Sequence, residues 1–272
     1  MNIPFVKMHS NGNDFVIVDN VKLDNRFTPS KIRKIANRNT GIGFDQFILL
    51  EESENSDSFM RIFNSDGNQV EMCGNAARCV ASLLFTKFKK NSLFIDTISN
   101  RIKATLEKNG EITISMKLPK QDFKYFYLSK NINVNNINFS NINKIFKEGM
   151  LVNMGNPHIV FIVSNLKSVD LKKYGEKIEK NPLFKKRINV EVVKIKDRNN
   201  IEVHFWERGA GLTKSCGSGI MAAFYACLQK KACSRSVQVM LPIGKVFAKL
   251  DKDEISVKGQ AMVSFLGQFY NE

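Results

Sequence analysis

Two cysteines, each followed by a glycine, are the strongest candidates for catalytic residues in the sequence. Cys73-Gly74 and Cys216-Gly217 each lead into small and apolar residues typical of a buried helix. A Gly-Asn pair lies upstream of each, and 60 residues separate Asn13 from Cys73, as they do Asn156 from Cys216. We therefore interpret the chain as two similar halves, offset by 143 residues, and expect the two cysteines to face each other across a cleft.

A cysteine at the start of a helix is suited to proton transfer. The unpaired N–H groups and partial positive charge there favour a thiolate and also bind carboxylates. A following glycine lets a ligand approach the backbone closely. With one small carboxylate held between two such sites, one thiolate would remove a proton from a carbon and the other thiol would deliver one to the opposite face. The pattern predicts inversion of a stereocentre by general acid–base catalysis.

Two further polar residues are candidates for orienting or deprotonating the cysteines. His158 follows the second Gly-Asn pair, and Glu207 precedes the loop that carries Cys216. A carboxylate at that point is equally compatible with ordinary loop structure, and nothing in the sequence pairs His158 with a particular thiol. The other three cysteines lie within or after the apolar runs, where a thiol is most often a small core residue.

The elements that must position these residues repeat in the same order in each half. Hydrophobic periodicity and turn signals predict two strands around the Gly-Asn turn, a helix, more strands, the Cys-Gly step, an enclosed helix and final strands. The enclosed helices are expected at 75–89 and 218–230, and the outer helices at 30–38 and 169–180. This order indicates two tandem α+β domains.

Domain limits follow from the same reading. Pro119 marks a boundary, and we predict an N-terminal domain of residues 1–118 plus 263–272 and a C-terminal domain of residues 119–262. Segment 121–147 is rich in Asn, Ile and Lys and predicts weak strands and a surface loop.

Composition narrows the class of protein. A chain of 272 residues with 43% hydrophobic and 25% charged residues is globular, and no stretch reaches the length of a membrane span. The first residues lack a secretory signal, which favours a cytoplasmic protein with reduced thiols. Five cysteines without a Cys-x-x-Cys pair, and only three histidines, argue against a disulfide framework and a zinc site.

The net charge bears on possible binding partners, and the absence of cofactor-binding motifs bears on possible cofactors. The net charge is +15, but the lysines are scattered, so we interpret it as a solvated basic surface rather than a nucleic-acid site. No dinucleotide fingerprint or phosphate-binding loop is present, and no lysine stands out as a Schiff-base site. A cofactor-free mechanism is favoured.

Eight short motifs give the chain a strong resemblance to a known family. They are GNDF (12–15), GIGFDQ (41–46), FNSDG (63–67), MCGNAARC (72–79), MGNPH (154–158), RIN (187–189), ERGAG (207–211) and SCGSG (215–219). In order and spacing the chain resembles diaminopimelate epimerases over essentially its whole length. The resemblance implies two pseudo-symmetric domains, each an antiparallel sheet wrapped around a central helix.

The resemblance also implies an activity. It implies a homodimeric isomerase that interconverts LL- and meso-2,6-diaminopimelate, without metal or pyridoxal phosphate, on the bacterial route to lysine and peptidoglycan. Cys73 and Cys216 would be the acid–base pair, with His158 and Glu207 as polar helpers. The residues implied to hold the substrate are Asn13, Gln46, Asn64, Asn156, Asn189, Glu207 and Arg208, with the backbone at Gly74, Asn75, Gly217 and Ser218.

The sequence differs from the family pattern at some positions, and three other functions are alternatives. Leu212 replaces a glutamate usual in the family, and Lys214 adds positive charge near Cys216, which favours its thiolate. Proline and hydroxyproline racemases typically carry histidine where this chain has Asn75, and isomerases that use a single acid lack the cysteine pair. A non-catalytic nucleic-acid-binding protein would instead show binding that weakens steeply with salt.

Overall fold

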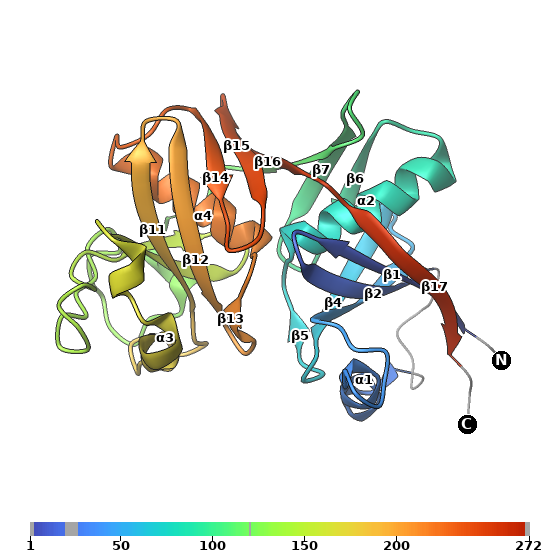
Figure 1. Ribbon diagram of the computed structural model, residues 1–272, viewed down its shortest axis with the longest axis horizontal. Coiled ribbons are helices and arrows are strands. Elements are labelled where there is room, and N and C mark those ends of the chain that lie inside the picture. The colour runs from blue at the N-terminus through green and yellow to red at the C-terminus, as the bar shows by residue number, and fades with distance from the viewer. Residues whose placement is uncertain (1–2, 20–26, 120, 270–272) are drawn as a thin grey trace. The chain divides into compact units, whose positions relative to one another are not determined.

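The chain divides into two compact units in a computed structural model that describes residues 3–19, 27–119 and 121–269 (Figure 1). Unit 1 comprises Met1–Met116 and Lys258–Glu272, and unit 2 comprises Lys117–Val257. The expected domain limits, after residues 118 and 262, stay a prediction.

Unit 1 is built on one mixed sheet. Its strands are β1 (Ile3–Ser10), β2 (Asn13–Val18), β3 (Gln46–Glu51), β4 (Ser58–Asn64), β5 (Gln69–Val70), β6 (Ser92–Asp96), β7 (Arg101–Leu106), β8 (Ile112–Lys117) and β17 (Met262–Phe269). They pair in the order β17-β1-β2-β3-β4-β6-β7-β8, with β5 added to β4. The pairs β2–β3 and β4–β6 are parallel.

Unit 2 repeats this arrangement. Its strands are β9 (Met150–Asn153), β10 (Pro157–Ile162), β11 (Asn189–Asp197), β12 (Asn200–Glu207), β13 (Gly211–Thr213), β14 (Ser236–Met240), β15 (Lys245–Asp251) and β16 (Glu254–Gly259). The order is β9-β10-β11-β12-β14-β15, with β13 added to β12 and parallel pairs β10–β11 and β12–β14. The predicted internal repeat is therefore confirmed in the strand pairing.

Four helices explain the parallel pairs. They are α1 (Pro29–Ala36), α2 (Gly74–Phe88), α3 (Leu171–Glu179) and α4 (Gly217–Gln229). Each lies in the sequence between two strands that pair in parallel, because a parallel pair needs a crossover connection that a helix supplies. The α+β prediction is confirmed, but the description of each sheet as antiparallel missed these crossover pairs.

The helices that follow the Cys-Gly steps are enclosed, as predicted. In unit 1, α2 packs against β1, β2, β6 and β7, and in unit 2, α4 packs against β9, β10, β11, β12 and β15 (Figure 1). Residues 74–81 and residues 217–224 are all buried. Glycine and alanine make much of these surfaces small, so the strands can approach on several sides. The outer helix α1 begins after Thr28, whose hydroxyl accepts the Lys31 N–H at 3.3 Å.

One expectation about unit 2 is wrong. Segment 121–147 forms a 3₁₀ turn at Phe123–Phe126 and isolated bridges rather than strands, in the part of it that is described. It is also not only a surface loop, because Phe126, Leu128, Phe139 and Phe146 are buried in the core of unit 2. These apolar residues have no regular period, so the sequence pattern did not reveal their burial.

Candidate active site

Cys73 and Cys216 occupy equivalent positions, each as the N-cap of an enclosed helix. Both have extended backbone, and each sulfur accepts a helix N–H at 3.4 Å, Cys73 from Ala76 and Cys216 from Gly219. Their exposed fractions are 7% and 5%. The predicted placement at helix starts is confirmed, and the unpaired N–H groups of each first turn lie beside the sulfur.

Asn13 lies beside Cys73 and Asn75 in unit 1. Its Oδ1 is 3.9 Å from Cys73 Sγ and 3.3 Å from Asn75 Nδ2. Asn13 begins β2, whereas Gly74 and Asn75 form the first turn of α2, so the Gly-Asn turn and the Cys-Gly step meet here. The 60-residue spacing in the sequence thus corresponds to a real contact in this half.

Gln46 and Asn64 form a second polar group in unit 1. They are direct partners on β3 and β4, and Gln46 Nε2 donates to Asn64 Oδ1 at 3.0 Å. Both are buried, and the other Gln46 atom, Oε1, is buried without a hydrogen-bond partner. Since a buried polar atom without a partner is unfavourable, Gln46 Oε1 is an acceptor available to a ligand donor.

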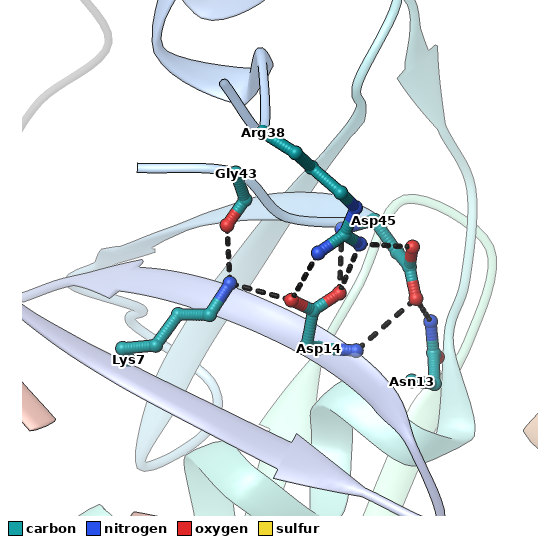
Figure 2. A network of polar contacts seen from close by, with 6 residues as sticks. All are labelled: Lys7, Asn13, Asp14, Arg38, Gly43 and Asp45. Carbon is teal, nitrogen blue, oxygen red and sulfur yellow. Dashed lines mark hydrogen bonds and ion pairs between the residues drawn. The ribbon is translucent and has the colours of Figure 1, made fainter. Parts of the chain in front are cut away.

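A charged network lies behind Asn13, and sequence reasoning did not single it out (Figure 2). Asp14 accepts hydrogen bonds from Lys7 at 2.6 Å and from Arg38 at 2.7 and 3.0 Å. Burial opposes ionisation, but these two cations outweigh it and lower the Asp14 pKa to about 2. Burial raises the pKa of the neighbouring Asp45. Both aspartates lie inside the quoted motifs GNDF and GIGFDQ, which was the signal for them.

His158 in unit 2 is held by two partners. Its Nε2 is 2.8 Å from Asn156 Oδ1, and its Nδ1 is 2.8 Å from Glu191 Oε1. His158 and Glu191 have 0% exposure, and burial raises the pKa of Glu191. Sequence reasoning missed Glu191, whose only signal was one acidic residue inside an apolar strand run.

Asn189, Glu207 and Arg208 lie where β11 begins and β12 ends. Asn189 Nδ2 donates to the Pro157 carbonyl at 2.9 Å, and Asn189 Oδ1 accepts the Arg208 backbone N–H at 2.9 Å. Glu207 is the last residue of β12 and pairs with Gly211 on β13. Asn189 therefore joins the strand that carries His158 to the loop that leads to Cys216.

The last candidate site residues of unit 2 lie in the first turn of α4. Ser218 Oγ is 3.6 Å from Cys216 Sγ. The next residue, Gly219, lies so close to Glu191 that a Cβ on it would be 2.6 Å from Glu191 Oε1. Leu212 is 57% exposed, so its side chain does not pack into the core of this unit.

The cysteines and the possible metal ligands can both be located among the described residues. All five cysteines are buried, and none is in a disulfide. Within the described parts of the chain, no three or more His, Cys, Asp or Glu side chains cluster so as to hold a metal ion. Within the same parts, no helix is long and apolar enough to cross a membrane.

The fold defines a class of proteins built from two such units. A crystal structure described as a probable proline racemase from Agrobacterium radiobacter K84 is similar, with a TM-score of 0.70 and 14% identity. The match covers 99% of this chain and 93% of that one. At this identity the similarity concerns the fold alone.

Comparison with sequences is more specific. A curated diaminopimelate epimerase of Sphingopyxis alaskensis is 37% identical over 265 residues, which are 97% of this chain and 96% of that protein. One of Carboxydothermus hydrogenoformans is 37% identical over 272 residues, covering 98% of this chain and 99% of that protein. The family model for diaminopimelate epimerase matches residues 5–120 and 150–263. The chain belongs to the diaminopimelate epimerase family and is an isomerase. The resemblance stated from the motifs is confirmed.

Proposed function

We propose that this protein interconverts LL- and meso-2,6-diaminopimelate by proton transfer through Cys73 and Cys216. Membership of the family supports the substrate. The observation that carries the mechanism is that each unit presents one buried cysteine as the N-cap of an enclosed helix. Position at a helix N-terminus favours the thiolate, which is the form that accepts a proton from carbon.

The reaction needs two thiols in opposite protonation states. The thiolate of one cysteine removes the α-proton, and the thiol of the other donates its proton to the opposite face of the carbon. The product then differs only in configuration, and the two cysteines have exchanged protonation states. The substrate carboxylate is held by first-turn N–H groups, at Gly74 and Asn75 in one unit and Gly217 and Ser218 in the other.

The remaining candidate residues orient the substrate. Gln46 Oε1, a buried acceptor without a partner, suits a substrate ammonium group. The other residues assigned to substrate binding are Asn13, Asn64, Asn156, Asn189, Glu207 and Arg208. His158 and Glu207 orient or deprotonate the cysteines. We further propose that the enzyme is a cytoplasmic homodimer in lysine and peptidoglycan precursor synthesis, working without metal or pyridoxal phosphate.

Solvent exchange tests the proposed reaction directly. LL-diaminopimelate incubated with the enzyme in D₂O should form the meso isomer and gain deuterium at one α-carbon, which NMR and mass spectrometry detect. Proline, offered in the same way, should gain no deuterium. Formation of no meso isomer together with no exchange would reject the substrate assignment.

Cysteine variants test the two-thiol mechanism. Cys73→Ala and Cys216→Ala should each abolish epimerisation of diaminopimelate. Cys79→Ala is the matched control, because Cys79 is a free, fully buried thiol on the same helix as Cys73 and burial raises its pKa. It should keep a near-normal rate. A near-normal rate in either of the first two variants would refute the two-thiol mechanism.

A further inference from the structure

A directed chain of side chains runs past Cys73, and it begins at a buried cation. Arg78, on α2, has 0% exposure. Its Nη2 donates to Asn75 Oδ1, and its Nε donates to Ser10 Oγ at 3.1 Å. No carboxylate among the described residues forms an ion pair with it. Two of its guanidinium nitrogens therefore donate to neutral oxygens, one of them the Asn75 amide, and Nη1 is buried without a hydrogen-bond partner.

The chain ends at a carboxylate (Figure 2). Asn75 Nδ2 donates to Asn13 Oδ1 at 3.3 Å, and Asn13 Nδ2 donates to Asp45 Oδ2 at 2.8 Å. Asp45 is held in turn by Arg38, whose Nη2 lies 2.8 Å from Asp45 Oδ1, and by the Asp14 backbone N–H at 3.2 Å. The sequence of donors is Arg78, Asn75, Asn13 and then Asp45.

The two charged ends fix the orientation of both amides. The oxygen and nitrogen of an asparagine amide are normally assigned from their partners. Arginine can only donate and an ionised carboxylate can only accept. Asn75 must therefore turn its oxygen to Arg78, and Asn13 must turn its nitrogen to Asp45. Asn13 Oδ1 is left facing Cys73 Sγ, at 3.9 Å.

We propose that Arg78 and Asp45 are positioning residues that hold the Asn13 carbonyl toward Cys73, which gives the neutral Cys73 thiol a fixed acceptor. A hydrogen bond to the neutral form of an acid disfavours its ionisation. This acceptor therefore opposes the helix N-terminus and the Arg78 charge, which favour the thiolate. It also aims the S–H bond of the proton-donating state.

The other charged groups near this chain do not replace its role. Cys79, on the same helix, is buried and its pKa is raised, so it carries no charge near neutral pH. Lys7 and Arg38 are engaged by Asp14, which they hold as a carboxylate. The inference rests on the proposed function in one respect, since only proton transfer by Cys73 makes the orientation useful for catalysis.

Two substitutions of Asp45 separate orientation from charge. Asp45→Asn removes the charge but keeps an oxygen that accepts from Asn13 Nδ2. Asp45→Leu removes both, so that only the donor from Asn75 still holds the Asn13 amide and the Asn13 carbonyl is held less firmly toward the sulfur. The Asp45 side chain is 40% exposed, and either change should leave the core intact. Asp45→Ala repeats the test with a smaller side chain if the leucine variant does not fold.

The readout is the alkylation rate of Cys73, which needs no substrate. The full-length protein is treated with iodoacetamide from pH 6 to 9, and the Cys73 peptide is quantified by mass spectrometry. Because only the thiolate reacts, the rate follows the ionised fraction. Asp45→Leu should raise the rate at pH 7 by more than twofold and by up to about fivefold, the limit expected for complete loss of one neutral hydrogen bond to the thiol. Asp45→Asn should change it less than twofold.

Each outcome decides the proposal. Equal acceleration in both variants would mean that the charge of Asp45 acts rather than the orientation of Asn13, and an unchanged rate in Asp45→Leu would also overturn it. In turnover, Asp45→Leu should lower kcat more than it changes KM. If the wild type does not epimerise diaminopimelate, the proposed function fails, while the alkylation rates still test the orientation of Asn13.

Discussion

Glu191 should tolerate replacement by glutamine and should not tolerate truncation. Its Oε1 lies 2.8 Å from His158 Nδ1, and both side chains have 0% exposure. Glutamine keeps the volume and offers both an acceptor and a donor to the ring nitrogen, so Glu191→Gln should cost about 1 kcal/mol or less. Glu191→Ala leaves the ring nitrogen without its hydrogen-bond partner and opens a cavity, which should cost about 3–5 kcal/mol.

The only tryptophan of the chain makes this prediction measurable within unit 2. Trp206 lies next to Phe205, which is the direct partner of Glu191 across β11 and β12, and its Nε1 donates to Glu179 at 2.7 Å. Urea unfolding followed by Trp206 fluorescence therefore reports on the surroundings of Glu191. In thermal unfolding followed by the same fluorescence, a loss of 3–5 kcal/mol in the free energy of unfolding should lower the melting temperature by about 10 °C.

A control on the neighbouring strand tests whether the effect belongs to the pair. Glu202, on β12, is 31% exposed and its nearest cation lies 3.8 Å away. Glu202→Ala should change stability by less than about 0.5 kcal/mol. If Glu191→Ala were no more destabilising than Glu202→Ala, or if Glu191→Gln matched Glu191→Ala, the reasoning from the buried hydrogen bond would be refuted.

Two further predictions concern Gly219 in the first turn of α4 and Asp14 on β2. Gly219→Ala should lower the free energy of unfolding, measured in urea, by about 1–3 kcal/mol, because Glu191 is too buried to move away from the new Cβ. Replacing a helical glycine by alanine ordinarily raises this free energy by ~1 kcal/mol, and an unchanged value would contradict the prediction. Asp14 has a folded pKa of about 2, so its stabilisation is complete above its ordinary pKa and is lost as the pH falls from about 4 to 2. Asp14→Asn should therefore be less stable than wild type by about 1–2 kcal/mol at pH 7, after allowance for its partial exposure, and the gap should close near pH 2; a gap independent of pH would exclude the charge as its source.

Local signals predicted much of the fold. The enclosed helices and their cysteine caps follow from hydrophobic spacing and from small residues after each Cys-Gly step, and these features depend on neighbours along the chain. The internal repeat also predicted that both halves share one order of strands, because equivalent residues in similar sequences form equivalent elements.

Non-local contacts account for what was missed. Glu191 meets His158 only because β10 and β11 pair in parallel, which places two residues 33 positions apart side by side. The crossover through α3 that creates this pairing leaves no mark in the residues themselves. Asp14 and Asp45 meet in the same way, since β2 and β3 also pair in parallel after the crossover through α1. A sequence motif marks such residues but does not say which of them touch.

The pairing of β17 with β1 has a consequence for biosynthesis. Ile3 lies opposite Phe269, so the first and last described strands of the chain form one antiparallel ladder in unit 1. The sequence of unit 2 is therefore an insertion within unit 1. During translation unit 2 can form its strand pairs while β1 still lacks one of its two partners, because β17 follows unit 2 in the sequence. Closing a contact between residues 3 and 269 is slow, so a circular permutant that begins at Lys117, the first residue of unit 2, and joins β17 directly to β1 should fold faster than the natural order, because each unit is then continuous in sequence.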